Sequence, residues 1–284
     1  MTEFDQGSGF SPPRDNYVYE HYNDDLNPPS KPLPVPLVAN VNDQHPIPVD
    51  VFWSMRSPYS YLSLDRLLYL ASHYNVDMTI KTVFPVAIRM PSLISGSIWY
   101  KWGGMMVDTH MVAKYEGIPY RWPKPDPIVQ DLANFPDCSS AVAPLEEQPH
   151  IQKLVRLAAA AQLQGKSLQY QHNVHRLIWD GTTDDWQPHL ERAVELADMD
   201  YQAVVKDIDA NPEEYDAVAD QNAKEHMMTG HGGVPNMSIR GIGEPFFGQD
   251  RILHFFWRLR QNGLTTRKEP VAPFVSRPLH WPDN

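Results

Sequence analysis

The chain has 284 residues, of which 42% are hydrophobic, and this predicts a globular protein with a sizeable core in one large or two modest domains. Its formal net charge of −11 at pH 7 argues against nucleic acid or an anionic membrane as a partner. A cytoplasmic location is expected, because the sequence has no apolar run long enough to span a membrane, no secretory signal pattern at its start, and a single cysteine, Cys138.

The first part of the chain predicts a proline-rich arm followed by a strand–helix–strand unit. Residues 1–47 are rich in proline, so we expect an extended arm that is either disordered or wrapped around the body or a second subunit. Within residues 48–90, a β-branched and aromatic strand at 49–53 precedes a helix that stops near Asn75 and a second strand at 78–84. The two strands are expected to be parallel, because the helix between them favours a right-handed crossover.

Residues 91–230 are predicted to form an inserted helical domain. The segment 91–146 has no clear periodicity and is rich in Trp, Met, Gly and Pro, so it is predicted to cover a site. Helical periodicity returns at Pro149 and continues to Gly230, with Ser167 as an expected helix cap inside this stretch.

Residues 231–264 are predicted to complete the sheet. A strand at 236–240, a second at 245–247 and a helix at 249–262 follow in order. The remaining residues, 265–284, are expected to form a tail over the surface or into a partner.

Two separated motifs carry most of the functional information. The loop Ser57–Ser60, with the sequence Ser-Pro-Tyr-Ser, opens the first helix, and the segment 233–251 runs from Gly-Val-Pro to Gly-Gln-Asp-Arg. With these motifs the chain resembles the 2-hydroxychromene-2-carboxylate isomerase and kappa-class glutathione transferase family over residues 49–262. The resemblance implies an α/β fold of the DsbA and kappa type, which is a thioredoxin-like fold with a large α-helical insertion.

Weaker similarity and some departures lie around these motifs. Lys101, Asp108 and residues 117–119 resemble spaced positions of the family's inserted domain. The chain departs from the family at Gln249, where serine is usual, at residues 54–56, and in having no clear counterpart of the asparagine after the second strand.

The loop chemistry depends on the two serines. Cysteines would occupy the positions of Ser57 and Ser60 in a disulfide oxidoreductase, so this loop cannot form a disulfide. The free N–H groups and the dipole of the helix that starts at Pro58 favour an anionic sulfur near Ser57, although a simple helix N-cap is an open alternative. The resemblance implies that Ser57 is the catalytic residue and donates a hydrogen bond to the thiolate of the cofactor, glutathione.

The resemblance also implies binding sites for glutathione and for a substrate. Val234 and Pro235 are the predicted binding residues for the cysteinyl unit: Val234 would pair with it in the way a residue before a cis proline does, and the sequence does not show whether Pro235 is cis. Gln249 and Asp250 at a helix start would bind the γ-glutamyl unit, and Lys101 would hold a carboxylate, although a helix-stabilising Asp and a solvated Lys are the ordinary alternatives. The predicted substrate-binding residues are Arg56, Tyr59, Trp99 and Trp102.

The histidines give little support for other chemistry. His172 and His175 have a spacing that could face one metal ion, but no third ligand is close in sequence, so no metal site is expected. His226 and His231 are expected to cap a helix end. The sequence has no nucleophile elbow, P-loop or dinucleotide motif.

The predicted function is that of a glutathione-dependent isomerase of the 2-hydroxychromene-2-carboxylate type. Glutathione thiolate, held at Ser57, would add reversibly to an unsaturated, aromatic carbonyl substrate. A kappa-like glutathione S-transferase and a non-catalytic thioredoxin-fold peptide-binding module remain alternatives. The expected partners are a small-molecule substrate and, by family analogy, a second copy of the chain in a homodimer.

Overall fold

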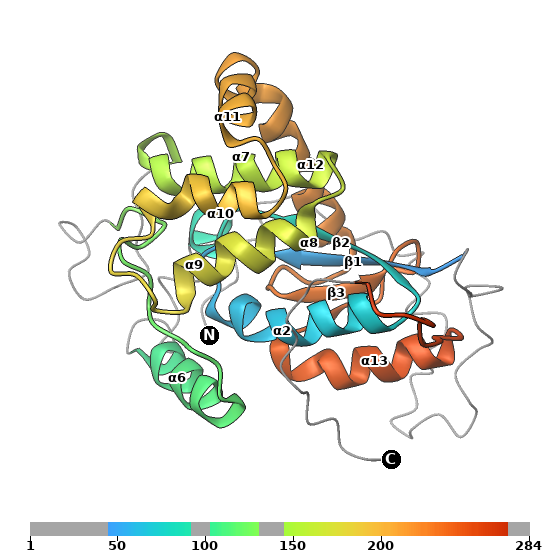
Figure 1. The fold of residues 1–284 in the computed structure, drawn as a ribbon. Coiled ribbons are helices and arrows are strands. Elements are labelled where there is room, and N and C mark those ends of the chain that lie inside the picture. The colour runs from blue at the N-terminus through green and yellow to red at the C-terminus, as the bar shows by residue number, and fades with distance from the viewer. Residues whose placement is uncertain (1–44, 92–102, 131–144, 272–284) are drawn as a thin grey trace, which may run out of the picture.

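A four-stranded mixed sheet organises the fold (Figure 1). The computed structural model describes residues 45–91, 103–130 and 145–271. The strand order is β2-β1-β3-β4, with β1 parallel to β2 and β3 antiparallel to both β1 and β4. The predicted parallel pair and C-terminal hairpin are therefore confirmed. The strands are β1 (Ile47–Trp53), β2 (Val76–Thr82), β3 (Asn236–Ile239) and β4 (Phe246–Phe247).

Two helices, α2 (Pro58–His73) and α13 (Ile252–Gln261), lie along one face of the sheet (Figure 1). Pro58 opens α2 without losing a helical hydrogen bond, because the first N–H groups of a helix have no partner in the helix. The helix ends where the backbone of Tyr74 becomes extended and pairs with Thr266. The predicted stop near Asn75 is thus confirmed.

The inserted part lies between β2 and β3. Helix α7 packs on β2 and on α12, and this arrangement covers the other face of the sheet (Figure 1). The helices of this part are α3 (Val86–Arg89), α6 (Gly104–Glu116), α7 (Pro149–Leu163), α8 (Ser167–Tyr170), α9 (Arg176–Trp179), α10 (Leu190–Leu196), α11 (Tyr201–Ala210) and α12 (Pro212–Met228), with a π-helical turn at Gln171–His175.

Two expectations for the insertion are corrected. Ser167 is not a helix cap: its Oγ accepts the N–H of Ile80 at 3.1 Å and joins α8 to β2. The segment without clear periodicity contains the regular helix α6, which buries only Met105, Thr109 and Ala113 among its side chains. A helix that is mostly exposed needs no continuous apolar stripe, and this explains the missing signal.

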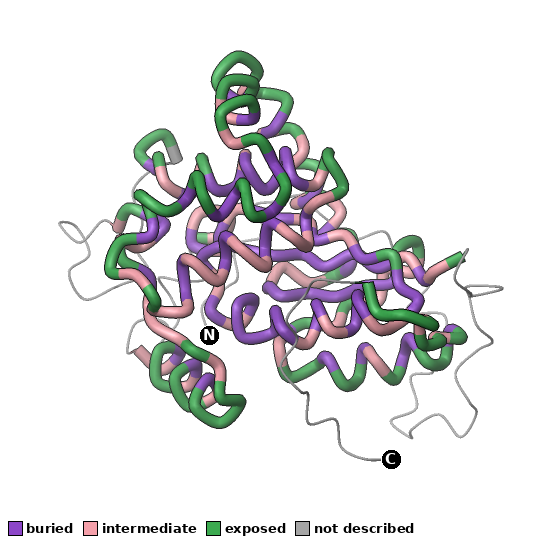
Figure 2. The backbone as a smooth tube through the Cα atoms, viewed as in Figure 1, coloured by how far each residue is buried: buried purple, intermediate pink, exposed green. Residues whose placement is uncertain are grey.

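One hydrophobic core joins the sheet to the insertion (Figure 2). Val51 in β1, Leu67 in α2, Leu154 in α7 and Phe255 in α13 are fully buried members of it. The insertion is therefore packed as part of the same body, and it fixes elements that surround the end of β1.

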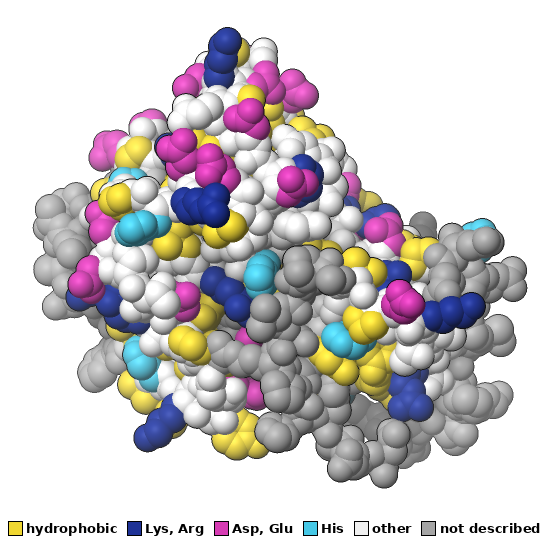
Figure 3. Space-filling model, in the orientation of Figure 1, with side chains coloured by type: hydrophobic (Ala, Val, Ile, Leu, Met, Phe, Trp, Pro, Cys, Tyr) yellow, Lys and Arg dark blue, Asp and Glu magenta, His cyan; other side chains and the backbone are white. Residues whose placement is uncertain are grey.

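Where the structure describes them, the acidic surface and the C-terminal tail lie as the sequence analysis predicted. Acidic side chains gather on the outer end of the insertion over α10 and α11 (Figure 3). The start of the tail runs beside the end of α2, where Asn75 N–H donates to Thr265 O at 2.9 Å and Val271 N–H donates to Ser72 O at 3.0 Å. No helix among the described residues is long and apolar enough to cross a membrane. The predicted arm through residue 44 lies outside the described residues.

Candidate active site

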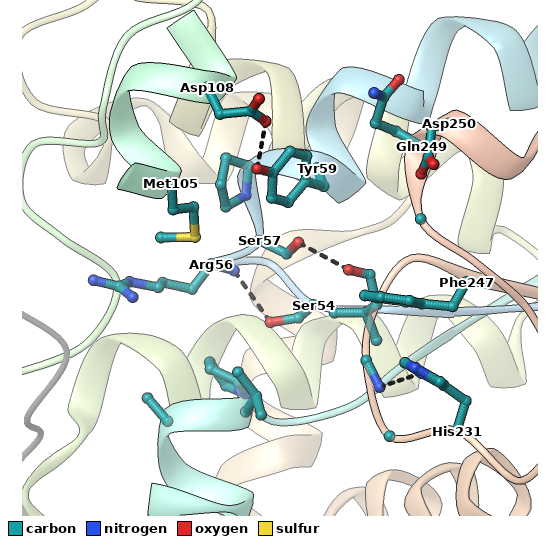
Figure 4. Close-up of a pocket in the computed structure, with 18 of the residues that line it drawn as sticks. Ser54, Arg56, Ser57, Tyr59, Met105, Asp108, His231, Phe247, Gln249 and Asp250 are labelled. Atoms are coloured by element: carbon teal, nitrogen blue, oxygen red, sulfur yellow. Dashed lines mark hydrogen bonds between the residues drawn. The ribbon is translucent and has the colours of Figure 1, made fainter. Parts of the chain in front are cut away.

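A cavity of about 790 Å³ lies at the C-terminal end of β1, between the start of α2 and the loop that leads into β3 (Figure 4). Its wall combines the Ser-Pro-Tyr loop, α3, α6 and the Gly-Gly-Val segment before β3. The two predicted motifs, which are separated by almost the whole insertion, therefore meet on one cavity.

Ser57 is placed at the N-terminus of α2, at the centre of the cavity (Figure 4). Its Oγ accepts the N–H of Ser60 at 3.2 Å, which confirms the helix N-cap. The same Oγ lies 3.5 Å from the carbonyl oxygen of Val234, at the limit of a hydrogen bond. The hydroxyl proton is thus held only weakly and can turn toward a ligand.

The segment before β3 presents its backbone to Ser57. The Val234–Pro235 peptide is cis, and the Val234 N–H has no hydrogen-bond partner within the described part of the chain. His226 donates from Nε2 to the carbonyl oxygen of Gly233 at 2.9 Å and stacks on Phe52. His226 therefore holds this segment in place by a hydrogen bond. The prediction that His226 caps a helix end is wrong.

Gly233 is required by the packing of the site. A Cβ at this position would lie 2.4 Å from Cε2 of Phe247 and 2.9 Å from Cε1 of His231. Both distances are far inside van der Waals contact, so a larger residue would displace the two rings.

The loop before Ser57 is fixed from the insertion. The carbonyl oxygen of Met55 accepts hydrogen bonds from His175 Nε2 at 3.1 Å and from Trp179 Nε1 at 2.9 Å. His175 Nδ1 in turn accepts from Trp53 Nε1 at 2.9 Å. Burial lowers the pKa of His175 to about 3, so the ring is neutral and both of its nitrogens are used. No local sequence pattern predicts this support.

Arg56 and Tyr59, two of the predicted substrate-binding residues, line the cavity, and each already has a charged partner. Arg56 forms a bidentate ion pair with Asp126 and lies over the ring of Trp122 at 5.1 Å. A substrate carboxylate would therefore compete with Asp126 for this guanidinium. Tyr59 donates from its hydroxyl to Asp108 Oδ2 at 2.6 Å, which joins α2 to α6 (Figure 4).

Gln249 and Asp250 lie on the cavity wall near the start of α13 (Figure 4). The Gln249 Oε1 accepts a hydrogen bond from Arg66, so this oxygen is occupied. Asp250 is exposed and forms no hydrogen bond or salt bridge with any residue that the structure describes, although its charge interacts with that of Arg66. Gly248, with φ of 104°, allows the chain to turn so that this carboxylate folds back over the loop.

Three predicted residues cannot be placed. Lys101, Trp99 and Trp102 lie outside the described residues, as does Cys138. His172 and His175 do not converge on a metal, because His175 points into the core, and the described ranges contain no group of three or more potential metal ligands.

The sequence did not mark two further residues, one on the cavity wall and one behind it, as parts of the site. His231 lines the cavity, with Nδ1 accepting the N–H of Gly233 at 2.9 Å, and is not the predicted helix cap. Arg89 donates to the carbonyl oxygens of Phe84 at 2.7 Å and Gly232 at 3.0 Å. Burial lowers its pKa to about 10, and no carboxylate in the described part of the chain pairs with it.

This fold and site define a thioredoxin-fold protein in which serine hydroxyls stand at the two reactive positions of the loop. The DSBA-like thioredoxin domain family matches residues 48–258, and the chain belongs to this family. The predicted α/β class and DsbA-like thioredoxin fold are thereby confirmed.

Solved structures with related folds include two of low sequence identity. A 2-hydroxychromene-2-carboxylate isomerase is 22% identical, covers 76% of this chain and 98% of its own, and has a TM-score of 0.49. A probable DsbA oxidoreductase from Streptomyces coelicolor is 17% identical, covers 76% of this chain and 89% of its own, and has a TM-score of 0.50. No curated protein sequence matches the chain significantly.

Proposed function

We propose that the protein is a glutathione-dependent isomerase of the 2-hydroxychromene-2-carboxylate type. One observation carries the proposal: the weakly held hydroxyl of Ser57 and the unpartnered N–H of Val234 face the same cavity at the N-terminus of α2. A thiolate is favoured at such a terminus, and an extended peptide can pair with such a backbone edge.

Each part of glutathione has a proposed partner in the chain. Ser57 would donate to the sulfur, and the N–H and C=O of Val234 would pair with the cysteinyl unit. The exposed carboxylate of Asp250, which forms no salt bridge among the described residues, would supply a partner for the γ-glutamyl ammonium group. We assign the glycyl carboxylate to Lys101, by the resemblance of its sequence position, and not to Arg56, whose charge is already paired with Asp126.

The cavity also has room for an apolar substrate beside the peptide. Its volume is of the size that small-molecule sites have, and its wall contains Val86, Met90, Met105, Val112 and Phe247. When bound, glutathione would supply a thiolate that adds reversibly to a conjugated double bond. Ser57 would hold that sulfur in its ionised form, and the apolar wall would orient an unsaturated, aromatic carbonyl compound against it.

A kappa-like transferase would use the same residues and differ in releasing the conjugate. The motif resemblance covers both groups of enzymes, and release of the conjugate is what distinguishes the transferase from the isomerase. We also propose a cytoplasmic location, where reduced glutathione is abundant, and a homodimer by family analogy.

Calorimetric titration with reduced glutathione and with S-methylglutathione tests the proposal. The proposal requires that reduced glutathione binds, that its thiol pKa is lowered in the complex, and that S-methylglutathione binds without any titrating thiol. Isomerisation of unsaturated aromatic carbonyl acids should then be detected by absorbance only when glutathione is present. Absence of glutathione binding at millimolar concentration would refute both enzyme proposals and favour the peptide-binding module.

A further inference from the structure

His231 stands on the cavity wall with one ring nitrogen engaged and one without a partner. Its Nδ1 accepts the N–H of Gly233 at 2.9 Å, and Nε2 has no hydrogen-bond partner within the described part of the chain. An accepting Nδ1 carries no proton, so the neutral ring must carry its proton on Nε2. His231 is therefore a hydrogen-bond donor on the wall of the cavity.

The position of this donor is fixed by packing. The imidazole stacks on Phe247 with ring centroids 4.0 Å apart and planes 22° from parallel (Figure 4). The same ring borders Gly233, whose neighbour Val234 contacts Ser57 Oγ through its carbonyl oxygen. Adjacent Cα atoms are about 3.8 Å apart. His231 is therefore bonded to Gly233 and Ser57 to Val234, which are consecutive residues of one short segment.

The charges around His231 suit a neutral ring and a developing negative charge. Arg89 donates to the carbonyl oxygen of Gly232 and His226 donates to that of Gly233, so neither of these neighbours brings a negative charge to the segment. Burial lowers the pKa of His231, and this keeps the ring uncharged at neutral pH. In Figure 4, Asp108 lies on the opposite side of Ser57 from His231, and Asp250 lies above Phe247.

We propose that His231 is a second catalytic residue, whose Nε2–H hydrogen-bonds the carbonyl oxygen of the substrate during thiolate addition. This inference rests on the proposed function. When the sulfur bonds to the β-carbon, the π electrons of the double bond move toward the carbonyl oxygen, and the donor stabilises the charge there. When the sulfur leaves, the electron pair returns to the double bond. No proton is transferred from the ring, so the step balances with a neutral histidine in the same state before and after.

Two conjugates and three variants test the proposal by binding alone. The ligands are the glutathione adduct of 4-phenyl-3-buten-2-one, which keeps a carbonyl oxygen, and S-benzylglutathione, which has none on its S-substituent. His231→Phe keeps the stacking on Phe247 and removes the donor, while His231→Gln restores an N–H donor. His254→Phe makes the same change at an exposed position of α13 outside the cavity wall and serves as the control.

His231→Phe should weaken binding of the carbonyl adduct about two- to tenfold relative to S-benzylglutathione, since one neutral hydrogen bond is lost. His231→Gln should recover part of this selective loss, and His254→Phe should show none. In glutathione-dependent Z-to-E isomerisation of 4-phenyl-3-buten-2-one, which needs only addition, bond rotation and elimination, loss of one oxyanion donor should lower kcat about 100-fold.

Three outcomes would overturn the proposal in different ways. Equal losses for both conjugates would show that His231 only supports Gly233, and unchanged affinities would show that it does not touch the substrate oxygen. Failure of the wild-type protein to bind either conjugate or glutathione itself would refute the proposed function, and this inference with it.

Discussion

Replacing Ser57 by alanine should raise the pKa of a bound thiol by about one to two units. The hydroxyl contacts the Val234 carbonyl oxygen only at 3.5 Å, so its proton is available for a better acceptor. A hydrogen bond to a charged acceptor contributes about 1.5–3 kcal/mol, and one pKa unit corresponds to about 1.4 kcal/mol. The helix dipole remains in the variant, so part of the pKa depression should persist.

The thiolate absorbance of bound glutathione, followed as pH is varied, measures this shift directly. Ser57→Ala also removes the cap on the Ser60 N–H, which should cost about 1 kcal/mol of unfolding free energy. Asp200→Ala is a matched control, because Asp200 caps α11 by accepting the Ala203 N–H at 3.0 Å and is not part of the cavity wall. It should lose similar stability and leave the thiol pKa unchanged.

Ser57→Thr tests whether the hydroxyl group itself lowers the thiol pKa, because this variant keeps the hydroxyl that Ser57→Ala removes. Threonine keeps the donor and the cap, so the bound thiol should stay acidic. An unchanged thiol pKa in Ser57→Ala would refute the reasoning, because the helix terminus alone would then hold the thiolate.

Three further predictions concern the rest of the site. Asp250→Asn should weaken calorimetric binding of glutathione about two- to fivefold and leave cysteinylglycine, which lacks the γ-glutamyl unit, unaffected; the carboxylate is exposed, so the loss is small. Burial holds the pKa of His175 and His226 near 3 in the folded protein, below the value of about 6.5 in the unfolded chain. The stability that these neutral histidines contribute should therefore be complete above pH 6.5, and the free energy of unfolding should fall by about 1.4 kcal/mol per histidine and pH unit on acidification toward pH 3. A urea midpoint that is equal at pH 7 and pH 5 would contradict this. Gly233→Ala should cost about 1–3 kcal/mol in urea unfolding because its Cβ meets Phe247, and the cost should shrink in a Phe247→Ala background, whereas the same cost in both backgrounds would exclude the clash.

The parts of the site that the sequence predicted are those encoded locally. A strand, a Ser-Pro turn and an amphipathic helix are contiguous, so the placement of Ser57 at a helix N-terminus follows from residues within one turn of it. The turn before β3 is equally local, and Val234 is found where the motif placed it. Long-range pairing was predictable only where a crossover rule applied, as for β1 and β2.

The missed contributions depend on contacts between distant segments. Asp126 pairs with Arg56 across 70 residues, and nothing in either local sequence marks the partner. His231 acquires its position by stacking on Phe247, which belongs to the next hairpin. A histidine beside a helix end looks the same in sequence whether it caps that helix or faces a cavity, so only tertiary packing decides between the two.

The insertion does more than cover the cavity, because it sets the geometry of the reactive loop. Met55 O would be an unpaired buried acceptor without His175 and Trp179, and a buried polar group without a partner costs about 1–3 kcal/mol. Both donors come from the stretch where a π-helical turn runs into α9, and such a turn inserts an extra residue that changes which side chains face the core. The irregular turn therefore places the neutral imidazole under the loop, and the position of Ser57 relative to Val234 depends on a helix more than a hundred residues further along the chain.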